Sequence, residues 1–360
     1  MPISRRVTLL SLVSTPIAAA LASPTSPTRP PAPLTRRDFR VKTIDGVRIR
    51  VREVQPPSPD KGRPILLIHG ARVPGIGSFD LDVPNGSLAG DLALGLNRRV
   101  YVMDARGYGG SDRPSAMGRP AAESRPLSRA YEVVRDIDAV VQKATQLSEA
   151  TQADLLGWAT GGAWAAYYAS LWPEHVARLV TLNALYGATT AHASLGPGSN
   201  TADPAHPDRL NPTLGGYALY PGSSLLPGWD RSIPDTDKSV WRDPAIASAY
   251  VAAALASDPE SRRHDPPAFR APLGAIEDSF YQAAGRRLYD ASSITARLLV
   301  VRSERDFWSR PEDATDFAHD AVRAQTTRIV TIPEATHFVH LDRPQHGRDL
   351  LLQEVVSFLQ

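Results

Sequence analysis

A sharp turn at residues 157–162 has the residue pattern that presents a catalytic side chain. An apolar run leads into Gly157-Trp158-Ala159-Thr160-Gly161-Gly162, and a helical pattern follows. Glycines two positions before and two after a central residue leave room for a strained strand-to-helix turn that holds a Ser, Cys or Asp nucleophile. The central residue here is Ala159. Because a methyl group has no lone pair, this position cannot form a covalent ester intermediate.

An acid and a histidine follow this turn in the order of one catalytic triad arrangement. Asp306 comes shortly after one apolar run, and His337 comes shortly after the last one. The order turn, acid, histidine differs from that of the two familiar protease classes. Asp306 has an alternative interpretation as the cap of a helix that begins near residue 310, with Glu304 as the fallback acid. His340 competes with His337, whose position directly after the last strand favours it.

Two further turns carry polar residues directly after apolar runs. Ile68-His69-Gly70-Ala71 ends the first run, and residues 103–111 end the next. We expect His69 to order its turn through hydrogen bonds. Asp104 and Arg106 could contact a substrate, but we prefer the interpretation that they form a buried ion pair that joins two loops.

Together these motifs resemble the α/β-hydrolase fold superfamily over nearly all of residues 38–360. The shared features are a His-Gly turn, an Asp-x-Arg-Gly-x-Gly turn and an inserted lid before the acid strand. The resemblance implies that the backbone N–H groups of Ala71 and Thr160 form an oxyanion hole. It also implies that Asp306 orients His337 and that His337 is the general base. The chain departs from the family pattern at Ala159.

The missing nucleophile leaves three hypotheses about function. Loss of a triad serine costs on the order of 10⁶-fold in turnover, so conventional serine hydrolysis is excluded. A His–Asp pair and an oxyanion hole can still move a proton on a small, partly apolar carbonyl compound, which is the hypothesis we favour. The alternatives are a ligand-binding protein that has lost the reaction and an engineered serine-to-alanine variant of an ordinary ester hydrolase.

Aromatic residues and one arginine are the candidate substrate contacts. Arg72 follows the His-Gly turn directly and could bind an anionic group through its guanidinium, or could be a solvated charge at the rim. The hydroxyl of Thr160 is expected to bond to the main chain rather than to act as a displaced nucleophile. The aromatic candidates, which predict an apolar pocket, are Trp158, Phe307, Trp308 and Phe338.

The elements that must position these residues are predicted to form a doubly wound α/β fold with a mostly parallel sheet. A hairpin is expected across Asp45-Gly46. Unalternating apolar runs predict strands that are buried on both faces, at 65–68, 100–103, 153–156, 179–182, 298–301 and 329–332. Helical spacing is found at 128–147, 162–172, 310–324 and 345–359. Residues 188–295 separate two strands by far more than a crossover helix needs and are interpreted as an inserted lid.

Composition excludes several classes of site. The chain has 360 residues and no cysteine, so disulfides, thiolate metal sites and cysteine nucleophiles are absent. The formal net charge is only +2, which gives no argument for a nucleic-acid partner. The histidines lack metal-ligand spacing, so we expect no metal and no cofactor. A small molecule is the expected substrate or ligand, and oligomeric state cannot be read from the sequence.

The N-terminus has the features of an export signal. Residues 1–22 combine Arg5-Arg6, a moderately apolar run and a small-residue cleavage pattern, which resembles a twin-arginine signal. The run is shorter than the about 20 apolar residues of a membrane span and is interrupted by Pro16. Residues 23–36 are expected to be a proline-rich linker, and residues 37–360 the hydrolase-like domain. The sequence therefore predicts a periplasmic or secreted protein.

Overall fold

The computed structural model describes residues 34–190, 192 and 194–360. The expected signal of residues 1–22 and most of the expected linker lie outside the described residues. Strand β1 (Thr35–Lys42) already begins at Thr35, so the last two residues of the expected linker, Thr35 and Arg36, belong to the sheet instead. They pair with Gln55 and Val54 of strand β2.

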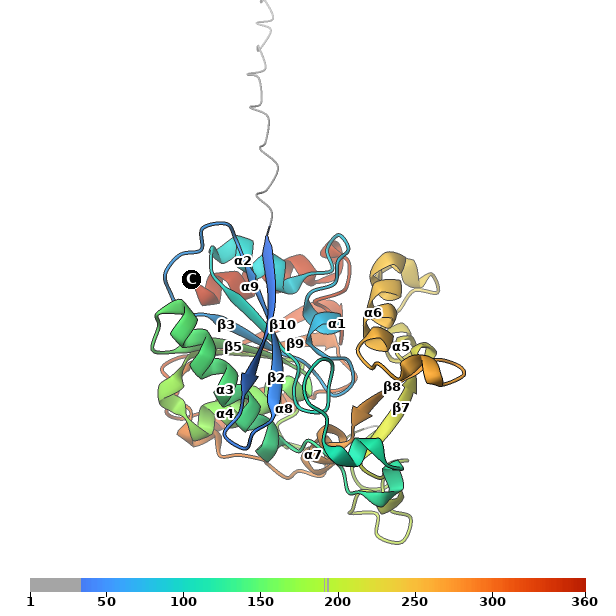
Figure 1. The fold of residues 1–360 in the computed structure, drawn as a ribbon. Helices are drawn as coiled ribbons and strands as arrows, with labels where there is room; N and C mark the ends of the chain where they lie inside the picture. Colours follow the sequence, from blue (N-terminus) through green and yellow to red (C-terminus); the bar gives the residue numbers. More distant parts are fainter. Residues whose placement is uncertain (1–33, 191, 193) are drawn as a thin grey trace, which may run out of the picture. The chain divides into compact units, whose positions relative to one another are not determined.

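An eight-stranded sheet forms the centre of the described chain, in the order β1-β2-β4-β3-β5-β6-β9-β10 (Figure 1). Strand β2 is antiparallel to both of its neighbours, and the other pairs are parallel. This confirms the predicted α/β fold class. After β1, the strands are β2 (Arg48–Gln55), β3 (Ile65–Ile68), β4 (Val100–Met103), β5 (Ala153–Trp158), β6 (Val176–Leu182), β9 (Arg297–Arg305) and β10 (Thr327–Thr336).

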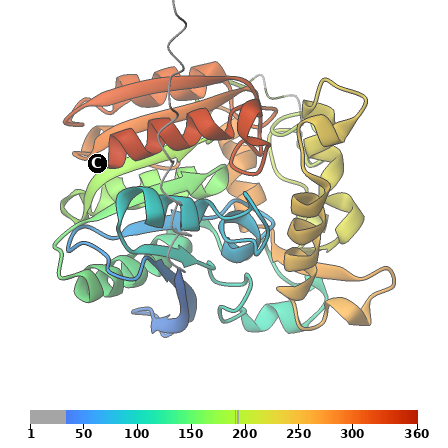
Figure 2. The ribbon, with the colours of Figure 1, turned by 90° about the horizontal axis from the view of Figure 1, so that it is seen from above.

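The burial of the central strands explains why apolar and polar residues do not alternate along them. Every residue of β3, β4 and β5 is buried, because helices cover both faces of the sheet. Helices α2 and α9 pack together on one face, and α3 and α4 pack together on the other (Figures 1 and 2). The helices flanking the sheet are α1 (Gly75–Phe79), α2 (Leu88–Leu96), α3 (Ala130–Ser148), α4 (Thr160–Leu171), α8 (Pro311–Asp320) and α9 (Arg348–Leu359).

The long segment between β6 and β9 has secondary structure of its own. An antiparallel pair, β7 (Tyr217–Pro221) and β8 (Ala268–Pro272), lies with helices α5 (Leu226–Ser232), α6 (Pro244–Ala256) and α7 (Gly274–Ala283). Figure 2 shows these yellow and orange elements beside the sheet, and α6 contacts α1. The insertion therefore packs against the loops that leave the sheet.

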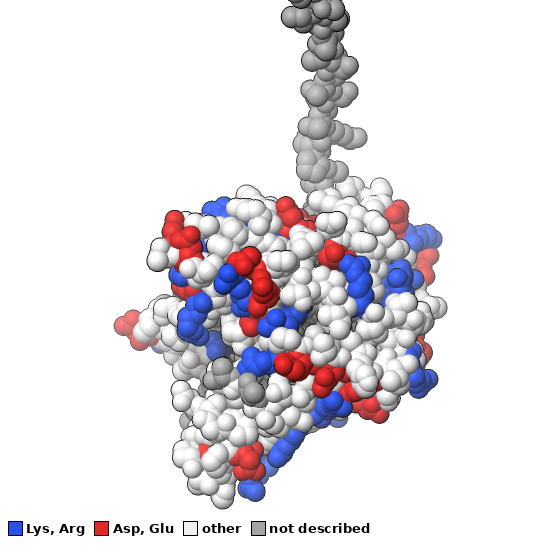
Figure 3. All heavy atoms as spheres, turned by 180° about the vertical axis from the view of Figure 1, so that it is seen from behind, with Lys and Arg blue, Asp and Glu red and all other residues white. Residues whose placement is uncertain are grey.

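The surface carries both signs of charge. Basic and acidic side chains are interspersed on the face shown in Figure 3, in keeping with the near-neutral balance of the sequence. Among the described helices, none has both the length and the apolar character needed to cross a membrane.

Candidate active site

The turn between β5 and α4 has the strained geometry that its glycines predict. Ala159 lies at φ 53° and ψ −121°, a conformation that non-glycine residues rarely adopt. A Cβ on Gly157 would lie 2.2 Å from the carbonyl oxygen of Gly161. A Cβ on Gly161 would lie 2.2 Å from the carbonyl oxygen of Ile68, and one on Gly162 would lie 2.7 Å from a neighbouring alanine Cβ. Only glycine fits at these three positions without movement of the backbone or its neighbours.

His337 and Asp306 form a buried pair beside this turn. The Nδ1 atom of His337 lies 2.5 Å from Oδ1 of Asp306, and the two residues are 5% and 7% exposed. The Asp306 carboxylate also accepts hydrogen bonds from the backbone N–H groups of Trp308 (3.0 Å) and Ser309 (2.8 Å) and from the Ser309 hydroxyl. Burial raises the pKa of Asp306, but the charge and hydrogen bond of His337 and these donors outweigh it, so the pKa is lowered. The acid is therefore ionised at neutral pH.

The two competing residues lie elsewhere. His340 is fully buried against Trp158, with ring centroids 4.5 Å apart, and it does not line the cavity described below. Burial lowers its pKa to about 3, so it is neutral at physiological pH. Glu304 accepts a hydrogen bond from the backbone N–H of Glu334 at 2.7 Å, in an exposed position. The structure thus pairs Asp306 with His337, and neither Glu304 nor His340 takes part in this pair.

Two donors hold the backbone of His337. Its carbonyl oxygen accepts hydrogen bonds from the Trp158 indole N–H and from the Asn183 side-chain amide, both at 3.0 Å. Asn183 lies just after β6 at φ 52°, and its Oδ1 accepts a hydrogen bond from the Ser303 backbone N–H at 2.7 Å. Sequence analysis missed Asn183, although a polar residue that follows a buried strand is the same signal that identified Asp306. Asn183 therefore links the ends of β6 and β9 to the loop that follows β10 and begins with His337, called the histidine loop below.

A cavity of about 210 Å³ opens over the turn and the His–Asp pair. His337, Ala159, Ala71 and Thr160 all line it. Within the described chain, the backbone N–H groups of Ala71 and Thr160 have no hydrogen-bond acceptor. Each of the predicted substrate contacts also lines the cavity, namely Arg72, Trp158, Phe307, Trp308 and Phe338. The structure thus brings together all the site residues that the sequence singled out, apart from Asp306, which touches the cavity only through His337.

Aromatic rings wall the cavity around the histidine. The Phe307 ring centroid lies 4.8 Å from that of His337, and Phe338 stacks on Trp229 of α5 at 4.7 Å. The Trp229 indole N–H donates to Asp342 at 2.7 Å, so a buried carboxylate ties the insertion to the loop after β10. Burial raises the pKa of Asp342 to about 6, despite its hydrogen bonds. Sequence reasoning missed Asp342 because its partner is far away in the chain.

Comparison with known proteins identifies the family of this fold. The sequence profile of the Alpha/beta hydrolase family matches residues 65–347. The chain belongs to this family. No curated protein matches the sequence significantly.

Solved structures of other α/β hydrolases share the fold at low sequence identity. One is a serine-to-alanine mutant of the meta-cleavage product hydrolase from Pseudomonas fluorescens IP01, complexed with acetates (18% identity, TM-score 0.57, covering 89% of this chain and 97% of that chain). The thioesterase domain from the curacin biosynthetic pathway matches at 15% identity and TM-score 0.55 (89% and 99%). An esterase from Exiguobacterium antarcticum matches at 16% identity and TM-score 0.54 (89% and 99%).

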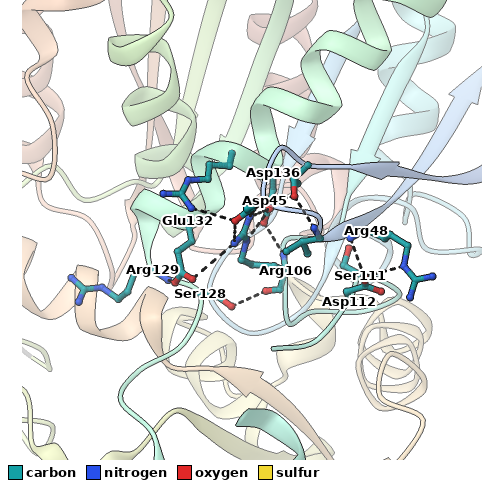
Figure 4. A network of polar contacts seen from close by, with 12 residues as sticks. Asp45, Arg48, Arg106, Ser111, Asp112, Ser128, Arg129, Glu132 and Asp136 are labelled. Atoms are coloured by element: carbon teal, nitrogen blue, oxygen red, sulfur yellow. Dashed lines mark hydrogen bonds and ion pairs between the residues drawn. The ribbon is translucent and has the colours of Figure 1, made fainter. Parts of the chain in front are cut away.

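The prediction that Asp104 and Arg106 form an ion pair with each other is wrong. In this α/β hydrolase, the Arg106 guanidinium lies between Asp136 of α3 (2.7 Å) and Asp45 of the β1–β2 turn (2.8 Å), as Figure 4 shows. Asp104 instead pairs with Arg50 of β2 at 3.3 Å. The two side chains leave the turn toward different elements, so each joins its loop to a neighbour, but through separate partners.

The role expected of His69 agrees with its contacts. Its Nδ1 atom lies 2.7 Å from the carbonyl oxygen of Gly70, and its Nε2 atom accepts a hydrogen bond from the Ala105 backbone N–H at 3.0 Å. The ring therefore joins the turn after β3 to the turn after β4. The Thr160 hydroxyl lies 3.5 Å from the hydroxyl of Ser279, so it faces the insertion rather than the main chain of its own helix. Among the described residues, no group of three or more potential metal ligands lies together.

Proposed function

We propose that this α/β hydrolase acts on a small, partly apolar carbonyl compound by proton transfer, without a covalent enzyme intermediate. The observation that carries the proposal is the His337–Asp306 hydrogen bond of 2.5 Å at the edge of a 210 Å³ cavity. Ala159 lines the same cavity where a nucleophile would otherwise stand. A histidine held by a carboxylate can accept a proton near neutral pH without any help from a serine.

The reaction follows from where the donors and acceptors point. Since Nδ1 of His337 faces Asp306, its Nε2 atom is the one available to a substrate. Nε2 takes a proton from a C–H next to the substrate carbonyl, and the C–H electron pair forms the C=C bond of an enolate. Alternatively it takes a proton from a water beside the Ala159 methyl group while the water oxygen bonds to the carbonyl carbon; in both cases the C=O π electrons move to the carbonyl oxygen. Negative charge then develops on the carbonyl oxygen, where the N–H groups of Ala71 and Thr160 stabilise it. The imidazolium is stabilised by ionised Asp306 and returns the proton to the product.

The backbone of the turn supports an enzyme rather than a silent binding protein. Strained conformations cost of order 1–3 kcal/mol and cluster at functional sites. Ala159 has such a conformation, and it sets the N–H of Thr160 at the cavity wall. The absence of a nucleophile at Ala159 is the observation that favours the second candidate, a protein that binds a ligand in the same cavity and does not convert it.

The first test follows proton abstraction directly. A panel of small aryl and alkyl ketones is incubated with the protein in D₂O, and loss of the α-proton signal is measured by ¹H NMR. We expect exchange with the parent and none above background with His337→Ala. Equal exchange by the two proteins would rule out His337 as the base.

The second test separates the two candidate functions. If the rest of the machinery is intact, Ala159→Ser creates esterase activity on p-nitrophenyl butyrate that the parent lacks, and adding His337→Ala removes it. If neither the parent nor Ala159→Ser converts any compound while ligands still bind, the ligand-binding candidate is correct.

We also propose that residues 1–22 direct export to the periplasm or the medium. The paired arginines Arg5 and Arg6 and the apolar run support this. Expression of the full chain followed by cell fractionation tests it. The paired change Arg5→Lys and Arg6→Lys is expected to leave the protein inside the cell, and export that does not depend on these residues would contradict a twin-arginine route.

A further inference from the structure

Two arginines stand in the wall of the cavity, which is otherwise largely apolar. Arg72 follows Ala71 directly, and Arg231 belongs to α5 of the insertion. No Asp or Glu lines the cavity, and no carboxylate in the described part of the chain forms an ion pair with either arginine. The fixed charges that face the cavity are therefore positive only. A cleft lined by one sign of charge concentrates ligands of the opposite sign.

Arg72 is held in place without being neutralised. Its guanidinium lies over the Tyr220 ring, with the central carbon 5.0 Å from the ring centroid. A ring face attracts the cation but does not cancel its charge, so N–H donors are left for an anion. Tyr220 is in β7, so this contact also joins the loop after β3 to the insertion.

The insertion brings Arg231 to the same cavity. A Cβ on Gly228, in the same helix, would lie 3.4 Å from the Phe307 ring, so α5 approaches the ring that covers His337. Both arginines are exposed, whereas Ala159 and His337 are 5% exposed. The cavity thus has reactive groups in its buried part and two guanidinium groups at its exposed part.

We infer that the ligand of this cavity carries a carboxylate, which Arg72 and Arg231 bind while its apolar body lies near Ala159 and His337. The inference rests on the proposed function for its reacting carbonyl, and it names the class of substrate. The volume agrees with a small body, since a cavity of about 150 Å³ holds benzene and this one is about 210 Å³. The substrate class is therefore a small aryl or alkyl carboxylate that also carries a carbonyl group.

Binding of two matched probes tests the inference without any turnover. 4-Phenylbutyrate and 4-phenylbutyramide share an aryl body and differ in charge, and their Kd values are measured by calorimetry at low salt. We expect the acid to bind at least about tenfold more tightly than the amide, because hydrogen bonds to charged groups are about twice as strong as neutral ones. In Arg72→Gln and Arg231→Gln this preference falls, and in the double variant it disappears.

A third arginine supplies the control. The Arg286 guanidinium also lies 5.0 Å from the centroid of a tyrosine ring, that of Tyr281, but Arg286 does not line the cavity. Arg286→Gln is expected to leave the acid-to-amide ratio unchanged. Equal binding of the two probes, no binding of either, or an equal loss in Arg286→Gln would overturn the inference. Failure of the catalytic proposal shows as absence of α-proton exchange by the parent, whereas failure of this inference shows as equal Kd values for the two probes, so the two failures give different results.

Discussion

Replacement of Asn183 by alanine should destabilise the protein well beyond the loss of a typical surface contact. Alanine at φ 52° costs about 1 kcal/mol in backbone strain. The buried N–H of Ser303 then lacks its acceptor, which costs about 1–3 kcal/mol. The His337 carbonyl oxygen still accepts a hydrogen bond from Trp158, so losing the hydrogen bond from Asn183 adds little to the cost. Together these effects give an expected decrease of about 3 kcal/mol in the free energy of unfolding.

Urea unfolding followed by far-UV circular dichroism measures this decrease, and Asn97 provides the matched control. Asn97 lies at φ 51° after α2, so Asn97→Ala imposes the same backbone strain, and no side-chain hydrogen bond of Asn97 is found in the described chain. We expect a decrease of about 1 kcal/mol for Asn97→Ala. If Asn183→Ala unfolds within experimental error of that control, the buried hydrogen bonds of Asn183 do not hold the histidine loop, and the reasoning fails.

Three further predictions concern the turn, a buried acid and the carboxylate that pairs with His337. Gly161→Ala should lower the free energy of unfolding by about 3 kcal/mol or prevent folding, because its Cβ would lie 2.2 Å from a backbone oxygen. Gly118→Ala is the control: it has open space around it and should be nearly neutral in the same urea assay. Burial raises the pKa of Asp342 from 3.8 to about 6, so the folded protein binds this proton more tightly than the unfolded chain, and the free energy of unfolding that it contributes below pH 4 is lost as the pH rises through 6. Asp342→Asn should therefore reduce the loss of stability between pH 4 and pH 8 by up to about 3 kcal/mol. An unchanged pH profile would contradict this. In an Ala159→Ser background, Asp306→Asn should lower esterase kcat by about 10³–10⁴-fold, and a loss under tenfold would show that Asp306 does not orient the histidine.

The residues at the ends of the central strands could be found from the sequence because parallel strands gather their carboxyl ends at one edge. Unalternating apolar runs located β3 and β4, after which His69 and Asp104 follow, and also β9 and β10, after which Asp306 and His337 follow. Chain order then separated the acid from the histidine.

What the sequence could not supply is which distant side chains meet. Arg106 has its closest partner in Asp136, 30 residues further along, and not in its near neighbour Asp104. The contact of Trp229 with Asp342 spans 113 residues. Arg231 lies in α5, a helix of seven residues, which is too short to give a helical signal. Short α1 and α2 were not predicted, because runs of five and nine residues give little helical signal.

The conformation of Ala159 also makes this position an adaptable point for protein engineering. Since φ 53° aims whatever the Cβ carries at the cavity, exchanging that one side chain would change the chemistry offered to a ligand and leave the scaffold as it is. A hydroxyl, a thiol or a carboxyl group placed there would face the same imidazole. A series of such proteins would compare three kinds of nucleophilic side chain with the methyl group of the parent in a single, otherwise identical environment.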